Sequence, residues 1–282
     1  MLVAFCLSVP GVWLDSRVIT GAPVWMKPAK FAISSAIYAG TMAWLLGYVE
    51  VSPRLMRSAG NVIAWVLVLE VALIDIQAAR GTTSHFNVAT PLDFVLFGVM
   101  GVSILILWMA SVAVMVGVFR QKFHDRAWGW TLRLAMLITV LGTLAGGLMV
   151  RPTPEHASGG HTVGAADGGP GLPAVGWSRD HGDLRIPHFM GMHAIQVLPL
   201  LFCMVRRRSV ALVWSCAGSY VALFGILLWQ ALRGQSILRP DGTTLWAVGI
   251  WLVAAVLALL VVSFGSSQVL NYRRCGLKDC AE

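Results

Sequence analysis

The chain has 282 residues, of which 57% are hydrophobic and only 12% are charged, and its mean hydropathy is +0.74. A soluble domain has about 25% charged residues. This composition excludes an ordinary water-soluble fold and predicts a chain embedded in a lipid bilayer. The five cysteines show neither a disulfide framework nor a zinc-ribbon spacing.

Apolar segments of membrane length recur along the chain. Residues 2–14 are apolar but short for a full crossing, so they predict a shortened first helix. Seven longer spans follow, which we expect at about residues 25–48, 61–79, 92–118, 128–150, 187–205, 210–232 and 244–264. The predicted fold is an all-α polytopic transmembrane helical bundle, a single domain over residues 1–282 with a short tail at 267–282.

The charges of the loops orient these helices. Twelve basic and four acidic residues fall in one set of alternating loops, and the other set holds nine of each, so the whole net charge of +8 lies on one side. Cytoplasmic loops carry such an excess of Lys and Arg. We therefore expect a multi-pass protein of a bacterial inner membrane, with its C-terminus in the cytoplasm. A nucleic-acid partner is not needed to explain the charge.

The predicted outer side carries most of the residues that could support chemistry. Six of the seven histidines fall there, and only His124 is cytoplasmic. The longest loop, 151–186, is also outside and contains a run of turn-forming residues at 167–173. A loop of this length is uncommon unless it is a lid, a binding loop or disordered. Trp177 and the charged run at 179–185 favour a lid that docks onto the helix ends.

A polar stripe marks the first long helix. Lys30, Ser34, Tyr38 and Thr41 recur at three- and four-residue spacing on an otherwise apolar helix. Such a stripe should face the interior of the bundle or a wet cavity. For Lys27 the favoured alternative is that its ammonium reaches the lipid headgroups, and for Lys30 the two interpretations are balanced.

Two carboxylates lie inside the second long span. A carboxylate in a membrane helix is by default a candidate for function, so we take Glu70 and Asp75 as candidate catalytic residues. Their side chains should point about 140° apart. The competing interpretation is a structural hydrogen bond or an ion pair with Lys30 or Arg80.

Three histidines near predicted helix ends are candidate ligands. His85 follows Arg80 in a short outer turn, while His188 and His193 lie just after Arg185, at the start of the 187–205 span. On one straight helix His188 and His193 would point about 140° apart, so they are unsuited to one shared ion. His193 together with His85 is the preferred ligand pair. Met residues at 190 and 192 could add soft ligands for copper(I), although methionine in an apolar helix is more often packing.

The chain resembles an uncharacterised family of bacterial polytopic membrane proteins. The resemblance rests on motifs spread over most of the chain, namely Trp25-Met-Lys-Pro-Ala-Lys-Phe31, Arg80-Gly-Thr-Thr-Ser-His-Phe-Asn87, Gly160-His-Thr-Val-Gly164, Asp167-Gly-Gly-Pro-Gly-Leu-Pro173 and Gly182-Asp-Leu-Arg185 running into 188–200. It implies the membrane fold but supplies no activity. Small-residue pairs at 142/146 and 215/219 indicate close helix packing and leave an oligomer open.

Three functions remain open at this stage, and whether the protein is an enzyme is undecided. The first hypothesis is a membrane redox protein with haem b near the outer face, its iron held by His85 and His193. Arg80, Arg185 or Lys30 would then pair with the haem propionates, and an electron-transfer partner would dock at the outer face.

The other two hypotheses use the same polar residues differently. One is a metal-dependent membrane enzyme in which His85, His188 or His193 holds zinc or copper and Glu70 or Asp75 activates water. The other is a carrier or receptor without chemistry, which binds a small anion in the polar cavity.

Overall fold

The computed structural model describes residues 1–205 and 208–276, with side chains described as far as Val262. Its helices are α1 (Leu2–Leu14), α2 (Met26–Leu46), α3 (Pro53–Ala79), α4 (Pro91–Arg120), α5 (Arg126–Ala145), the 3-10 helix η1 (Gly146–Val150), α6 (Arg185–Met192), α7 (Ala194–Met204), α8 (Val210–Leu232) and α9 (Gly242–Gly276). Two small antiparallel pairs accompany them, β1 (Val18–Ile19) with β2 (Ala22–Pro23) and β3 (Thr162–Val163) with β4 (Gly182–Asp183).

The predicted all-α class is confirmed, whereas the predicted seven spans are not. By length and composition, α3, α4, α5 with η1, α8 and α9 could each cross a membrane, and the bent pair α6–α7 would make a sixth span. Helix α2 is 21 residues long but is not among them. Helix α1, with 13 residues, has the expected bounds and stays short. The predicted tail at 267–282 begins within α9, and its last residues, 277–282, lie outside the described residues.

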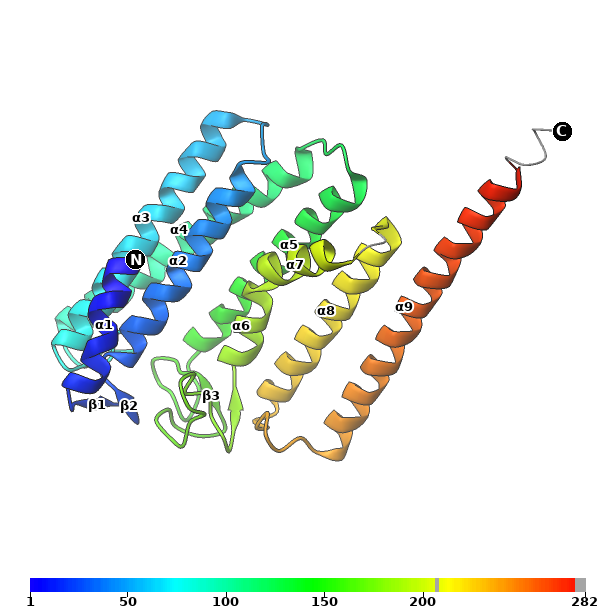
Figure 1. Cartoon of the computed structure of the whole chain (residues 1–282). Helices are drawn as coiled ribbons and strands as arrows, with labels where there is room; N and C mark the ends of the chain where they lie inside the picture. Colours follow the sequence, from blue (N-terminus) through cyan, green and yellow to red (C-terminus); the bar gives the residue numbers. More distant parts are fainter. Residues whose placement is uncertain (206–207, 277–282) are drawn as a thin grey trace.

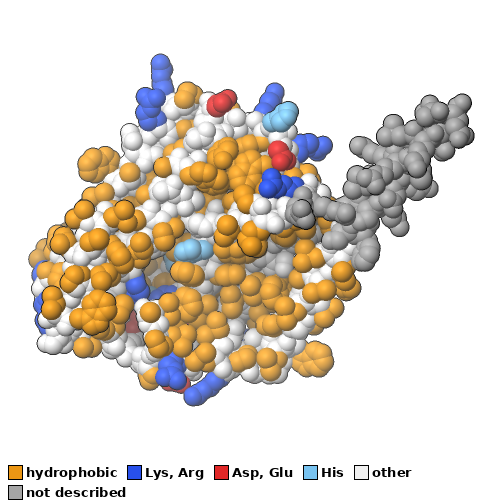
Figure 2. All heavy atoms as spheres, in the orientation of Figure 1, with side chains coloured by type: hydrophobic (Ala, Val, Ile, Leu, Met, Phe, Trp, Pro, Cys, Tyr) orange, Lys and Arg blue, Asp and Glu red, His pale blue; other side chains and the backbone are white. Residues whose placement is uncertain are grey.

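The connections between the helices gather at two ends of the bundle (Figure 1). One end, which we call the loop end, holds the β1–β2 hairpin, the 80–90 loop, the long 151–184 loop and the 233–241 loop. The opposite, basic end holds the short connections at 47–52 and 121–125. Figure 2 shows Lys and Arg side chains at both ends and hydrophobic side chains across the middle. This distribution is the one that a bilayer requires.

The fifth predicted span is not one straight helix. It divides at His193 into α6 and α7, which are bent by 49°. At the break the Thr139 hydroxyl accepts a hydrogen bond from the Ile195 amide at 3.1 Å and donates one to the Met192 carbonyl at 3.4 Å. A side chain inserted into the backbone hydrogen bonds of a helix is a recognised cause of a kink.

The crossing of α5 with α6 is very close. A Cβ atom at Gly142 would lie 2.3 Å from the carbonyl carbon of Gly191, and one at Gly146 would lie 2.8 Å from the His188 ring. The 142/146 pair therefore has the packing role that the sequence predicts. This contact holds the start of α6 against α5 and so fixes the position of His188.

Candidate functional site

Polar side chains from five segments meet at the loop end. We call this group the loop-end cluster and define it as Lys27, Lys30, Glu70, His85, His161, Asp167 and Arg185. Its members come from α2, α3, the 80–90 loop, the 151–184 loop and the start of α6. Figure 2 shows charged side chains recessed among apolar ones toward this end of the molecule.

The start of α2 is anchored by a network around Asp15. This carboxylate accepts hydrogen bonds from the Arg17 guanidinium and from the Trp25 indole, 2.9 Å away. Arg17 also donates to the carbonyl of Ala79 at the end of α3. The bonds from Arg17 hold the pKa of Asp15 well below its usual range. The network thus joins the first turn of α2 to the end of α3.

Lys27 and His85 form the centre of the cluster. The Nζ atom of Lys27 lies 3.2 Å from Nδ1 of His85 and 5.7 Å from the centre of the Phe31 ring. The charges of Arg185, Lys30, Glu70 and Asp167 all act on Lys27. Lys27 therefore faces the cluster rather than the lipid headgroups that the sequence favoured.

The His85 ring is held between aromatic rings in a neutral state. The centre of its ring lies 5.6 Å from that of Phe31 and 6.1 Å from that of Phe86. Burial lowers the pKa of His85 well below its ordinary value, and the positive charges of Lys27 and His161 act in the same direction. An ammonium can only donate, so with Lys27 charged Nδ1 accepts from it and the ring proton lies on Nε2; the Ser84 hydroxyl lies 3.1 Å from the same nitrogen and can donate to it as well.

That tautomer does not suit a metal or haem ligand. A ligating histidine binds the metal through one ring nitrogen and donates an N–H from the other to a carboxylate or carbonyl. In His85 the nitrogen that should donate is the one that faces Lys27. The residues around His85 therefore do not fit its predicted role as an iron or zinc ligand.

A histidine–carboxylate pair lies in the long loop beside the cluster. The Nδ1 atom of His161 is 2.9 Å from the Asp167 carboxylate, which also accepts from the backbone amides of His161 and Thr162. Burial alone would raise the pKa of Asp167, but these hydrogen bonds and the His161 charge bring it well below its usual range. Burial lowers the pKa of His161. The sequence offered no signal for this pair beyond the histidine content of the loop.

The 151–184 loop lies directly over two cations of the cluster. Lys30 Nζ donates to the carbonyl of Val175 at 3.1 Å, and Arg185 donates to the carbonyl of Gly176 at 2.6 Å. Arg185 also forms an ion pair with Asp183 at 2.6 Å, and the Asp183 side chain is fully buried. The loop is thus tied to the helix ends through the two cations.

Glu70 lies deeper in the bundle, without a hydrogen-bond partner among the described residues. Its residue is 3% exposed, both carboxylate oxygens are buried, and neither meets a donor among the described residues. The charge that acts on it is that of Lys27. Asp75 instead interacts with the N-terminal amine. The two carboxylates therefore diverge, as their spacing predicts, and only Glu70 belongs to the cluster.

Arg80 lies outside the loop-end cluster, in a network with Asp93 and Gln77. Its guanidinium lies 2.6 Å from the Asp93 carboxylate and also contacts the Gln77 side chain. Gln77 donates to the same carboxylate at 3.0 Å. This network joins the ends of α3 and α4, and it occupies the cation that was proposed to pair with a haem propionate.

His193 lies at the break between α6 and α7, and His188 lies within α6. Nδ1 of His188 is 2.8 Å from the Gly142 carbonyl, and Nδ1 of His193 is 2.8 Å from the Phe189 carbonyl. Carbonyls only accept, so both rings carry an N–H on Nδ1. The His193 ring stacks on Phe189 at 3.9 Å. These two rings have the tautomer that a ligating histidine needs.

The cluster brings together Lys30, Glu70, His85 and Arg185, whereas His193, which the sequence placed in the same pocket as the first three, has another partner, as do Asp75 and Arg80. Within the described ranges, no three His, Cys, Asp or Glu side chains are grouped as a metal site requires.

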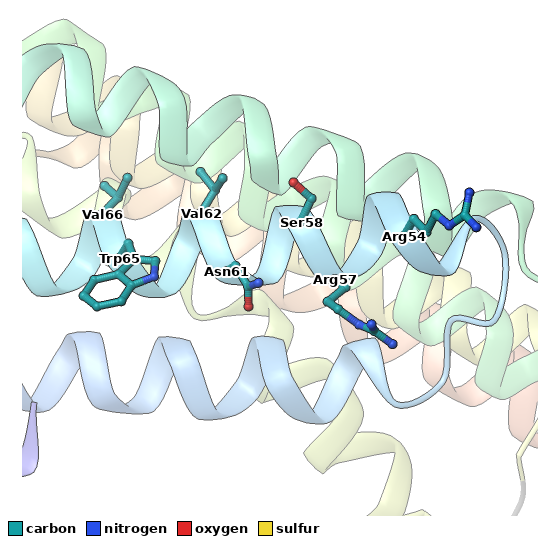
Figure 3. Close-up of a pocket in the computed structure, with 7 residues that line it drawn as sticks. All are labelled: Arg54, Arg57, Ser58, Asn61, Val62, Trp65 and Val66. Carbon is teal, nitrogen blue, oxygen red and sulfur yellow. The ribbon is translucent and has the colours of Figure 1, made fainter.

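An open groove of about 500 Å³ lies on α3 at the basic end (Figure 3). Its lining comes from one helix alone and consists of Arg54, Arg57, Ser58, Asn61, Val62, Trp65 and Val66.

Searches of protein-family models, curated proteins and solved structures find no match to this chain. The functional conclusion therefore rests on the residues of the cluster.

Proposed function

We propose that this chain is a multi-pass bacterial inner-membrane protein that binds a small carboxylate- or phosphate-bearing anion in the loop-end cluster. In this proposal α2 and the α6–α7 pair also cross the bilayer, which gives the seven spans. The loop end faces outward because the other end carries the excess of Lys and Arg. The binding step suits a carrier or a receptor.

The observation that carries the proposal is that two lysines of the cluster lack a direct ion-pair partner. Among the described residues neither Lys27 nor Lys30 forms an ion pair with a carboxylate; their acceptors are the His85 ring and the Val175 carbonyl. By contrast, Arg185 is paired with Asp183. Charges removed from water are costly unless an opposite charge accompanies them. An anion beside the two ammonium groups would supply that charge.

The 151–184 loop would act as the lid of this site. Its Val175 and Gly176 carbonyls contact Lys30 and Arg185, so the loop now uses donors that an anion would also use. A bound anion would compete with these carbonyls for the cations. Entry of the anion should therefore be accompanied by movement of the loop away from α2.

The direct test is anion binding to the purified full chain in detergent. Titration calorimetry with inorganic phosphate and with acetate should detect binding that falls at least about tenfold, or about 1.4 kcal/mol, in Lys27→Met and in Lys30→Met. Lys122→Met, which removes a cation at the basic end, is the matched control. Equal affinities in all four proteins, or binding of neither anion, would overturn the proposal.

A haem remains a second candidate because of the His188 and His193 tautomers. Both rings donate through Nδ1 to backbone carbonyls, so the Nε2 of His188 in α6 or that of His193 at the α6–α7 break could ligate iron. When bound, haem would supply one-electron chemistry. The visible absorption spectrum of the purified protein tests this. A Soret band that is lost in His193→Ala or His188→Ala but kept in His124→Ala would support haem, and a colourless protein would exclude it.

A further inference from the structure

The buried carboxylate of Glu70 is the least explained group in the bundle. Each of its oxygens is buried and meets no hydrogen-bond donor in the part of the chain that the structure describes; the residue lies in the second half of α3, toward the loop end. A buried polar group without a partner costs about 1–3 kcal/mol, and more when it is charged. A carboxylate kept in a membrane helix under these conditions is by default functional.

The charges around Glu70 are few. Helix α3 packs against α2 and α4. Helix α2 presents Lys27, which acts on Glu70, and Lys30, which is bound to the 151–184 loop. Helix α4 presents Asp93 at the loop end, where it is paired with Arg80. Lys27 is therefore the counter-charge of Glu70 among the described residues.

Lys27 would consequently interact with two negative charges, the Glu70 carboxylate and a bound external anion. In the empty site its ammonium balances the Glu70 carboxylate from a distance, without a hydrogen bond between them. An external anion that binds Lys27 would place a second negative charge near Glu70 and would offset the positive charge of Lys27. Both effects favour the protonated form of a carboxyl group.

We propose that Glu70 takes up one proton when an anion binds beside Lys27, so that the anion and the proton enter the site together. The inference rests on the proposed anion site. The carboxylate gains a proton from water at the loop end and becomes a neutral acid, and no bond other than this O–H forms. A monovalent anion and a proton together add no net charge to the bundle.

The coupling fixes the direction of the pH effect. Over the pH range in which Glu70 is ionised in the empty site, each unit of acidification should strengthen binding of a monovalent anion up to about tenfold. Glu70→Gln imitates the neutral acid and should bind the anion tightly with no such dependence. Asp75→Asn, which removes the neighbouring carboxylate on the other side of α3, should keep the wild-type dependence.

Infrared difference spectroscopy of the full chain tests the pair even without an anion. The carbonyl stretch of protonated Glu70, assigned by its loss in Glu70→Gln, should appear at higher pH in Lys27→Met than in the wild type. In the wild type, acetate should induce the same band at constant pH, with uptake of about one proton from a weakly buffered solution.

The outcomes separate the two proposals. If acetate binds without proton uptake and without the band, the coupling is wrong and the anion site stands. If neither anion binds but Lys27→Met still moves the titration of the band, the anion site fails while the electrostatic pairing of Lys27 with Glu70 stands. If Lys27→Met leaves the pH at which the Glu70 band appears unchanged, the coupling of proton and anion is overturned, whether or not an anion binds.

Discussion

The hydroxyl of Thr139 on α5 lies 3.1 Å from the backbone amide of Ile195, inside the break between α6 and α7. In a continuous helix that amide would donate to the carbonyl of residue 191. The Thr139 side chain is fully buried, so no water replaces the lost bond. One side chain on a neighbouring helix thus stabilises the bend and the position of His193.

Thr139→Val should therefore destabilise the protein by about 1–3 kcal/mol, because it leaves a buried amide without an acceptor. Thr139→Ser keeps the hydroxyl and should lose less. The midpoint of thermal unfolding in detergent measures both. Equal stability of the two variants would show that the hydroxyl does not support the break.

The sequence predicted the membrane class and most helix bounds because both depend on local apolar runs. The 210–232 span is an example, since it matches α8 at both ends. The break at His193 was not predicted because it depends on Thr139, more than fifty residues earlier in the chain. Hydrophobic periodicity cannot show a hydrogen bond from another helix.

The sequence predicted several of the residues that lie in the candidate site, but not which side chains contact one another there. From their places near the same ends of the spans, the sequence predicted that Lys30, Glu70, His85 and His193 would share one pocket. The first three lie in the cluster, whereas the His193 ring stacks on Phe189. The inward position of Lys27 depends on the Asp15 network, and the bond between Lys27 and His85 on the conformation of the 80–90 loop. These tertiary contacts leave no periodic pattern in the sequence from which they could be predicted.

The α5–α6 crossing should not tolerate a side chain at Gly142. A Cβ atom there would meet the backbone of Gly191, which cannot rotate away. Gly142→Ala should cost about 1–3 kcal/mol of stability through displacement of α6. Gly225→Ala on α8, where nothing lies within 4 Å of the added Cβ, should be neutral. If both variants unfold at the same temperature, the prediction that the α5–α6 crossing excludes a side chain at Gly142 is wrong.

Acidification should destabilise the fold through His85. Its pKa is lowered by burial, with Lys27 and His161 adding to the effect, from the ordinary value of 6.5. Below that pH the unfolded chain binds a proton that the folded chain does not, so the free energy of unfolding falls as pH falls. The loss is up to about 1.4 kcal/mol per pH unit for this one group.

His85→Gln keeps a side-chain acceptor for Lys27 but does not titrate. Its unfolding temperature should therefore fall less between pH 6.5 and pH 5 than that of the wild type. His124→Gln at the basic end is the control and should follow the wild type. If His85→Gln and the wild type lose stability in parallel, then His85 is not held neutral in the folded protein.

The 151–184 loop should open when its buried ion pair is weakened. Asp183 accepts from the backbone amide of Ser178 at 2.7 Å and from Arg185 at 2.6 Å, with its side chain fully buried. Asp183→Asn removes the charge and should cost about 2 kcal/mol, less than a fully buried pair because Arg185 is partly exposed. That corresponds to roughly a 30-fold larger open population.

Limited trypsin digestion measures this opening at Arg179, which is exposed on the loop. Cleavage after Arg179 should accelerate by that factor in Asp183→Asn, since the rate follows the open population when reclosing is fast. Asp180→Asn is the control because Asp180 forms an exposed pair with Arg239 at 3.5 Å, and such pairs contribute little. Similar cleavage rates in the two variants would mean that the buried pair does not hold the loop on the helix ends.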